Sequence, residues 1–572
     1  MTRSHDVDLV LIHPGSRLRI YQGLGQRLSA IETPVWVGLM ATFARRRGYT
    51  VAIVDAEADD LGPDETAARV LAMKPLLSVV VVYGHQPSAS TQNMTVAGEI
   101  CTALKERAPD AVVMLVGGHV AALPERTLRE EVADFVAGGE GLYTIVDLLE
   151  ALKAGAVESP KIRGLWYRGE GGAVHATPPA PLVQNVDNEM PEVAWDLLPM
   201  AKYRAHNWHC FGDLQRQPYA ALYTTLGCPY HCTFCCIQAP FKPGEQQAGY
   251  RETVNSYRFW SPEGIARQLE HLATKYGVRN VRISDEMFVL NTKHVHGICD
   301  RITERGLDLN MWSYARVDTV RGDDTVEKLK RAGMNWLCFG IESANDRVRD
   351  DVQKGFDQEL VYRIVGKVRD AGINVIGNYI FGLPEDDHAS MQQTLELALE
   401  LNCEFANFYS TMAYPGSELY TSAVKAGWKL PEKWSGYSQH SVDTLPLPTH
   451  HVSAAEVLRF RDRAWQVYFS HPPYLAMIER KFGAETAAHI KDVASHTLVR
   501  QHACAAARPR ASAPARAAAR RRSTRATGPE SAAPRRGGRR GRCAPPGTRG
   551  SRAAPASGAR RQSRANAGGS CC

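Results

Sequence analysis

Short apolar runs alternate with amphipathic stretches along the first 150 residues of the chain. Runs that are apolar at nearly every position are typical of parallel strands that are buried on both faces. The segments between them have apolar residues at helical spacing. This alternation predicts a doubly wound, Rossmann-like α/β domain. We expect strands at residues 7–12, 51–55, 77–83, 111–116 and 134–137, and helices at residues 35–47, 64–73, 92–107 and 143–153.

A second alternation of strands and helices runs from residue 221 to residue 411. Six strand-helix units of this kind predict a partial (β/α)6 barrel of the TIM type, whose ligands lie at the carboxyl ends of the strands. Two more amphipathic stretches, at residues 454–474 and 475–493, indicate a helical cap on the barrel, with a substrate lid as the alternative. The expected strands are residues 221–226, 280–284, 310–314, 336–341, 374–381 and 405–411.

Changes in composition suggest where the domains end. Residues 161–168 read as one more strand, and the stretch at residues 169–191, rich in Gly, Pro and Asn, reads as a linker. The predicted organisation is a first domain at residues 1–155, a linker region at 156–213, a core domain at 214–440, a helical region at 441–500 and a tail at 501–572.

The excess of positive charge is confined to the tail. The formal net charge is +7, yet residues 501–572 alone hold 17 Arg, no Lys and a single acidic residue, Glu530. The same segment has no Leu, Ile, Val, Met, Phe, Tyr or Trp, so it cannot bury a core and is expected to be disordered. Arg without Lys among Ala, Pro, Gly and Ser is also typical of GC-rich sequence read out of frame. The tail is therefore interpreted as disordered or as a frameshift artefact, and it carries no weight for function.

The remaining composition, 44% apolar and 23% charged over the whole chain, is that of an ordinary soluble protein. The longest apolar run is far shorter than the ~20 residues that span a bilayer, and the N-terminus lacks the apolar core of a secretory signal. We expect a cytoplasmic protein without a membrane partner. A nucleic-acid partner is not expected either, because the basic tail has no aromatic side chains on which bases could stack.

Glycine-bearing turns follow several strands of the first domain. They include Gly117 and Gly118 after the fourth strand, and Gly139 beside Glu140 after the fifth. Glycines allow a bulky ligand to approach the backbone, and ligands of doubly wound sheets lie beyond the carboxyl ends of the strands. No G-x-G-x-x-G motif follows the first strand, which argues against a dinucleotide.

Four cysteines lie close together at residues 228–236, on the loop after the first barrel strand. In a reducing compartment such clusters are more often metal ligands or catalytic thiols than disulfides. A structural zinc ion needs four donors, and no second C-x2-C pair exists in residues 1–500. The spacing Cys228-x3-Cys232-x2-Cys235 offers three thiolates on one loop, which would leave one iron of a four-iron cluster without a protein ligand.

This C-x3-C-x2-C spacing, with Phe234 just before the last cysteine, resembles the motif of the radical S-adenosylmethionine enzymes. The resemblance implies that Cys228, Cys232 and Cys235 hold a 4Fe-4S cluster, with S-adenosylmethionine bound at the open iron and an electron donor such as flavodoxin or ferredoxin. Cys236 is then a bystander. The resemblance also assigns S-adenosylmethionine contacts at successive strand ends: Phe234, Asp285, Glu286, Arg316, Glu342, Ile380 and Gly382.

The first domain resembles the cobalamin-binding domain that precedes some radical S-adenosylmethionine barrels, through its glycine turns and its strand spacing. The resemblance implies cobalamin contacts from Gly117, Gly118, Gly139 and Glu140. Many such domains carry D-x-H-x-x-G after the first strand, whereas this chain has His13-Pro14-Gly15 there, so no histidine of that motif is expected on the cobalt.

The two resemblances together imply an enzyme that methylates an unactivated carbon of a small-molecule substrate. Other radical chemistry, such as cyclisation or rearrangement, with or without cobalamin, is the main alternative. A metal or cobalamin sensor without enzymatic activity is a second one. A methylthiotransferase is disfavoured, because it needs three further cysteines before the barrel and only Cys101 lies before residue 200.

Overall fold

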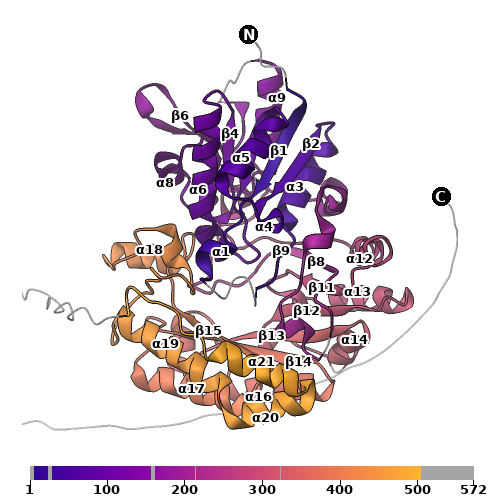
Figure 1. Ribbon diagram of the computed structural model, residues 1–572, viewed down its shortest axis with the longest axis vertical. Helices are drawn as coiled ribbons and strands as arrows, with labels where there is room; N and C mark the ends of the chain where they lie inside the picture. The colour runs from indigo at the N-terminus through magenta and orange to yellow at the C-terminus, as the bar shows by residue number, and fades with distance from the viewer. Residues whose placement is uncertain (1–4, 23–28, 156–160, 213, 323, 504–572) are drawn as a thin grey trace, which may run out of the picture. The chain divides into compact units, whose positions relative to one another are not determined.

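A computed structural model of the protein describes residues 5–22, 29–155, 161–212, 214–322 and 324–503. Two separate, mainly parallel sheets dominate the fold, and the described residues form one compact unit (Figure 1). The tail that was interpreted as disordered or as a frameshift artefact lies outside the described residues from residue 504 onward. The domain boundaries at residues 155, 213, 440 and 500 stay predictions.

The first sheet has the order β2-β1-β3-β4-β5-β6-β7. Its strands are parallel from β2 to β5, which confirms the predicted doubly wound domain. The order reverses between β1 and β3, and ligands of open α/β sheets bind at such a switch point. The strands are β1 (Val7–His13), β2 (Val51–Asp55), β3 (Pro75–Val81), β4 (Val113–Val116), β5 (Phe135–Ala137), β6 (Leu165–Arg168) and β7 (Val174–Ala176).

Helices cover both faces of this sheet, which is why its strands are apolar at successive positions. Along β1, Leu9 and Leu11 pack with α3 and α9, whereas Val10 and Ile12 pack with α5 and α6. The helices of this domain are α1 (Arg17–Ile20), α3 (Val35–Arg45), α4 (Ala56–Asp59), α5 (Pro63–Ala72), α6 (Ala89–Arg107), α7 (Gly118–Ala122), α8 (Pro124–Glu130) and α9 (Leu142–Lys153).

The predicted linker at residues 169–191 is wrong in part. It contains β7, which pairs antiparallel with β6 and so extends the first sheet by one strand beyond β6. Met190 and Trp195, just before and after its end, are buried. The short helices of residues 165–213 are η2 (Glu170–Gly172), α10 (Val186–Glu189), η3 (Trp195–Leu197), η4 (Met200–Lys202) and η5 (Trp208–Cys210).

The second sheet has the order β15-β14-β13-β12-β11-β8 and is parallel throughout, which confirms the partial barrel. Its strands are β8 (Tyr219–Leu222), β11 (Asn280–Ile283), β12 (Asn310–Ala315), β13 (Met334–Glu342), β14 (Asn374–Phe381) and β15 (Phe405–Ser410). Its helices are α11 (Lys242–Glu245), α12 (Pro262–Tyr276), η6 (Phe288–Leu290), α13 (Thr292–Glu304), η7 (Val317–Thr319), α14 (Thr325–Arg331), α15 (Asp346–Asp351), α16 (Gln358–Asp370), α17 (His388–Leu401) and α18 (Glu418–Lys425).

The strand predicted at residues 221–226 is two strands. β8 ends at Leu222, and β9 (Thr225–Gly227) then pairs antiparallel with β10 (Tyr257–Phe259). Asp285 causes the break, because its Oδ1 accepts the backbone N–H groups of Thr224, at 2.6 Å, and Thr225, at 3.1 Å. These groups are thereby withdrawn from the parallel sheet, and the chain turns toward the cysteine loop.

The C-terminal helices pack on the barrel, as the predicted cap requires. Tyr468 donates its hydroxyl proton to the carbonyl of Cys403, and Tyr474 donates to that of Glu404. The helix expected at residues 454–474 ends at Phe469, because Pro472 begins a new helix and cannot continue the old one. The elements are η8 (Trp434–Tyr437), α19 (Ala454–Phe469), α20 (Pro472–Phe482) and α21 (Ala484–Ala494).

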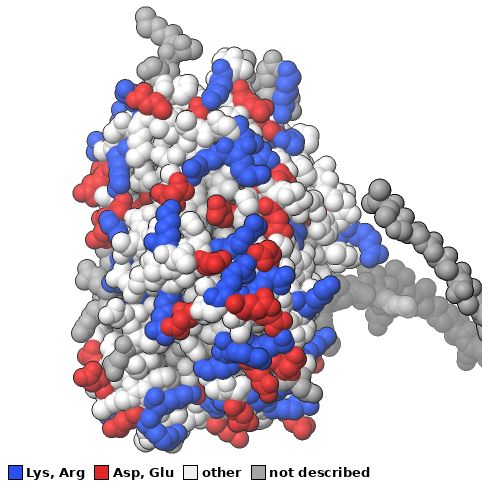
Figure 2. Space-filling model, turned by 90° about the vertical axis from the view of Figure 1, so that its right-hand side faces the viewer, with Lys and Arg blue, Asp and Glu red and all other residues white. Residues whose placement is uncertain are grey.

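The surface carries both signs of charge. Figure 2 shows Lys and Arg interspersed with Asp and Glu over the face drawn there. Within the described part of the chain, none of the helices combines the length and the apolar character that a membrane span needs.

Candidate functional site

A cavity of about 520 Å³ lies where the two sheets meet. The loop after β3 (residues 85–88) forms one wall, and the cysteine loop with the inner faces of β12 to β15 forms another. Residues 439–440 and α19 close the far end. Tyr314 on β12 donates to Gln86 on the β3 loop at 3.4 Å, so both domains meet inside the cavity.

The three predicted cluster cysteines, Cys228, Cys232 and Cys235, all border this cavity. Gly227 sets the start of their loop at a φ of +87°, and a Cβ there would come within 2.2 Å of the Ser256 carbonyl oxygen. Only glycine fits both conditions. The backbone N–H of Cys228 donates to Gln238 Oε1 at 3.0 Å. The loop is therefore held in place by the protein itself.

The side chains around the thiols suit a negatively charged cluster. Arg316 Nη1 lies 3.5 Å from Cys232 Sγ, and its guanidinium stacks on the ring of Tyr230 at 4.1 Å. Burial raises the pKa of Cys228 to about 12 and that of Cys235 well above its usual range. These thiols therefore become thiolates only when a cation displaces their protons.

The donor set fits a cluster better than a single ion. Among the residues that the structure describes, no three His, Cys, Asp or Glu side chains converge closely enough to hold one metal ion. A four-iron cluster is wider than one ion and takes its ligands from a wider space. Cys236 also borders the cavity and is buried like Cys228, so neither feature shows which of the four thiols are ligands. Its assignment as a bystander stays a prediction.

The two acidic residues after β11 have different surroundings. Both oxygens of Asp285 are used by Thr224 and Thr225, and Asp285 does not border the cavity. Glu286 does border it, and its buried Oε1 has no hydrogen-bond partner among the described residues. Burial raises the pKa of Glu286 to about 7. An ammonium group of a ligand would fit Glu286, whereas Asp285 holds the loop.

The other predicted S-adenosylmethionine contacts divide in the same way. Phe234, Arg316, Glu342 and Ile380 border the cavity. Glu342 has a φ of +64° at an irregularity in the β13–β14 pairing, and its carboxylate pairs with Lys354. Gly382 does not border the cavity, and its N–H donates to Asp386 Oδ2 at 2.9 Å. Gly382 therefore shapes the strand end, and a direct ligand contact from it is disfavoured.

The four predicted cobalamin contacts lie elsewhere in the first domain, away from the cavity wall. Gly117 packs against β3, where a Cβ would come within 2.5 Å of the Val82 carbonyl carbon. Gly118 has Ser90 as its nearest neighbour, and Gly139 has Pro240. Glu140 is buried in an ion pair with Arg258 at 2.8 Å, which ties the first domain to β10. These contacts favour structural roles for the four residues over direct contact with cobalamin.

The switch point of the first sheet is the part that faces the cavity. His85 to Ser88, which directly follow β3 and Gly84, line the wall there. No ligand contact was predicted at this strand end from the sequence, and the reversed strand order is the signal that would have found it. His13 at the end of β1 is bound by Asp55 at 2.8 Å and borders a separate, smaller pocket. His13 does not border the large cavity, and the expectation that no histidine of that motif reaches the cobalt stays a prediction.

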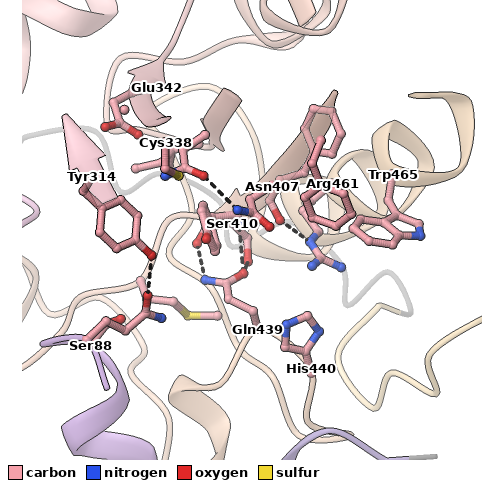
Figure 3. Close-up of a pocket in the computed structure, with 18 of the residues that line it drawn as sticks. Ser88, Tyr314, Cys338, Glu342, Asn407, Ser410, Gln439, His440, Arg461 and Trp465 are labelled. Carbon is pink, nitrogen blue, oxygen red and sulfur yellow. Dashed lines mark hydrogen bonds between the residues drawn. The ribbon is translucent and has the colours of Figure 1, made fainter. Parts of the chain in front are cut away.

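Sequence reasoning also missed the far end of the cavity. Gln439 Oε1 accepts the backbone N–H of Ser410 at 2.9 Å, and its Nε2 donates to the Ser410 carbonyl at 2.8 Å, so it closes the end of β15 (Figure 3). His440, Arg461 and Trp465 lie beside it (Figure 3). No motif marks these positions in the sequence.

Comparison with known proteins distinguishes the same two domains. Residues 222–398 match the Radical SAM superfamily, and residues 22–149 match the B12 binding domain. An uncharacterised methyltransferase of Pyrococcus horikoshii is 29% identical over 77% of this chain and 89% of its own length. An anaerobic magnesium-protoporphyrin IX monomethyl ester cyclase of Rubrivivax gelatinosus is 25% identical over 72% of this chain and 69% of its own length.

The fold is also that of a solved structure. TsrM of Kitasatospora setae, a radical S-adenosylmethionine methyltransferase solved with cobalamin and a 4Fe-4S cluster bound, has a TM-score of 0.58 and 14% identity. The likeness covers 87% of this chain and 100% of that chain. The two matched domains, the cysteine loop and the shared cavity lead to one conclusion. The chain belongs to the radical S-adenosylmethionine enzymes that carry a B12-binding domain, and its cofactors are a 4Fe-4S cluster, S-adenosylmethionine and cobalamin.

Proposed function

We propose that the chain is a cobalamin-dependent radical S-adenosylmethionine methyltransferase that acts on an unactivated carbon of a small molecule. One observation carries the proposal: the cysteine loop, the barrel strand ends and the switch-point loop of the B12-type domain all open on a single cavity. When bound, the cofactors supply one-electron cleavage of S-adenosylmethionine and a transferable methyl group. The protein has to bring a substrate carbon within reach of both.

The residues of the chain divide this work. Cys228, Cys232 and Cys235 would hold the cluster, with Arg316 beside Cys232 to offset its negative charge. Glu286 would bind the ammonium group of S-adenosylmethionine, because its buried oxygen is otherwise unpaired. Phe234 and Ile380 line the same wall and would hold the adenosyl group in an apolar space.

The relatives also keep a second function in view. One of them is named a cyclase, so radical chemistry without net methylation is the alternative. An electron donor such as flavodoxin or ferredoxin is part of either proposal, since cleavage of S-adenosylmethionine consumes one electron.

The test is anaerobic reconstitution with iron, sulfide, hydroxocobalamin, reduced flavodoxin and methyl-labelled S-adenosylmethionine. A methyltransferase should pass the label to the bound corrinoid and then to a small molecule from a cell extract. Formation of 5′-deoxyadenosine without label on the corrinoid or on any product would favour the cyclase-type alternative. Failure to bind either a cluster or a corrinoid would contradict both.

A further inference from the structure

The far end of the cavity has a charge of its own. Arg461 on α19 is only 5% exposed and borders the cavity together with His440 and Trp465. Its Nε donates to the Phe408 carbonyl at 2.7 Å, and its Nη1 donates to Asp462 Oδ1 at 2.8 Å. Its Nη2 has no acceptor among the described residues. Figure 3 shows the guanidinium pointing toward His440.

The neighbouring charges leave one positive charge unmatched. Asp462 is bound on both oxygens by Arg500, whose Nε and Nη2 each lie 2.9 Å away. Asp462 and Arg500 therefore form a complete pair, and Arg461 shares only one of its oxygens. Burial, together with Arg461 and Arg500, lowers the pKa of His440 well below 6.5, so this ring is neutral. The group carries a net charge of about +1.

Each of three other cationic side chains at the cavity has a carboxylate that no second Lys or Arg shares. Arg282 pairs with Glu32 at 3.1 Å, Arg316 pairs with Asp318 at 2.9 Å, and Lys354 pairs with Glu342. A buried charge without a counter-charge is costly, and retaining one is explained when a ligand supplies the opposite sign. Glu286 at the cluster end has a proposed cationic ligand. Arg461 at the far end needs an anionic one.

The walls near Arg461 are aromatic. Phe405, Phe408, Trp465 and Phe469 line the cavity beside it. A ligand that contacts these rings and the guanidinium at once has an apolar or aromatic body and one anionic group. A carboxylate carries one negative charge, whereas a phosphate monoester carries about −1.5 to −2 at pH 7 and would leave charge unmatched in a buried place.

We propose that Arg461 binds the carboxylate of the substrate and so presents the apolar part of that substrate to the cofactors. This inference rests on the proposed function, because it assigns the substrate class of the same cavity. It also accounts for a buried arginine that a purely structural role leaves incomplete. Its Nε holds α19 to β15 and its Nη1 binds Asp462 on the same helix, whereas its Nη2 faces no acceptor among the described residues.

The test measures binding by the reconstituted holoprotein and needs no turnover. Benzoate, benzamide and phenyl phosphate share one ring and differ in charge, and their dissociation constants can be compared by ligand-observed NMR. We expect benzoate to bind about tenfold more tightly than benzamide, and more tightly than phenyl phosphate. Arg461→Gln should abolish the preference for benzoate over benzamide. Arg463→Gln, an exposed arginine on the same helix, should leave it unchanged.

A second measurement is independent of the folding of Arg461→Gln. In the wild-type protein, the photoreactive carboxylate 4-benzoylbenzoate should label peptides from α19 or from residues 438–444, and benzoate should compete. Arg461→Lys, which keeps the charge, should retain part of the preference. Equal binding of benzoate and benzamide, a preference that survives Arg461→Gln in a folded protein, tighter binding of phenyl phosphate, or labelling elsewhere would each overturn the proposal. If the protein prefers the carboxylate but transfers no methyl group, the proposed function is wrong and the role of Arg461 stands.

Discussion

The two ends of the cavity are built from different parts of the chain, and one presents an unpaired carboxyl oxygen whereas the other presents a surplus positive charge. At the cluster end, a loop and the carboxyl ends of parallel strands present three thiols and Glu286. At the far end, α19 and the segment at residues 438–444 present Arg461 and His440. The first end takes its shape from the barrel, and the second is added by elements that follow the barrel in the sequence.

This difference separates cofactor chemistry from substrate choice. The Radical SAM match ends at residue 398 and the B12 match at residue 149, so neither includes His440 or Arg461. A cofactor shared by a family needs the same groups in every member, and strand ends hold them rigidly. A substrate differs between members, and added helices and loops can change without disturbing the sheet.

The largest expected effect tests the cluster end alone. Cys235→Ala should lose the iron-sulfur cluster and all activity, because two thiolates cannot hold it on this loop. Iron and sulfide content after anaerobic reconstitution is the measurement. Cys236→Ala is the matched control, since this neighbour also borders the cavity and should retain both iron and activity. Loss of iron in Cys236→Ala but not in Cys235→Ala would reverse the assignment.

A second substitution separates the two acidic neighbours. Glu286→Gln should weaken the binding of S-adenosylmethionine about tenfold or more, because a charge-assisted hydrogen bond is lost in a buried place. Asp285→Asn should instead lower the free energy of unfolding by about 1–3 kcal/mol, because an amide nitrogen in place of Oδ2 cannot accept the hydroxyl hydrogen bonds of Thr224 and Thr225. Equilibrium dialysis with labelled S-adenosylmethionine and denaturant titration distinguish the two. The opposite pattern would give Asp285 the ligand.

The same contrast explains what the sequence could predict. Strand-helix alternation predicted both sheets, since apolar periodicity depends on burial that the chain itself creates. The cysteine spacing placed three candidate ligands on the cavity wall, because a short loop keeps sequence neighbours together. Sequence patterns could not predict the roles of Glu140 and Asp285. These roles depend on Arg258 and Thr224, which are distant in the sequence and come near only in the fold.

Arg461 was beyond sequence reasoning for a further reason. A lone arginine on an amphipathic helix has no spacing that distinguishes it from exposed Arg463 two positions later. Its meaning arises from a charge balance among α19, residues 439–444 and Arg500, which no local pattern records.

A third substitution changes the charge balance between Asp462 and its two arginine partners. Asp462→Asn should lower the free energy of unfolding by about 1–3 kcal/mol, because Arg461 and Arg500 lose the partly buried negative charge that they share. The cluster content should not change, since Asp462 lies at the other end of the cavity. Denaturant titration and iron analysis of the same preparation check both statements. Glu485→Gln, an exposed residue on α21, is the control. An equal loss of stability in both variants, or loss of iron in Asp462→Asn, would contradict the separation of the two ends.

The smallest expected effect uses pH to read the positive charge at the far end. Burial, Arg461 and Arg500 lower the pKa of His440 below 6.5, so the folded protein keeps the ring neutral where the unfolded chain protonates it. The unfolded state then binds more protons, and the free energy of unfolding falls as the pH drops below 6.5. From about pH 7.5 to about pH 5.5, the free energy of unfolding of the wild type should fall by about 1 kcal/mol more than that of His440→Gln.

The control is His388→Gln, at an exposed position on α17, whose free energy of unfolding should fall as much as that of the wild type. Identical losses in wild type and His440→Gln would mean that this end of the cavity does not hold the surplus charge, because protonating His440 beside two arginines would then cost nothing.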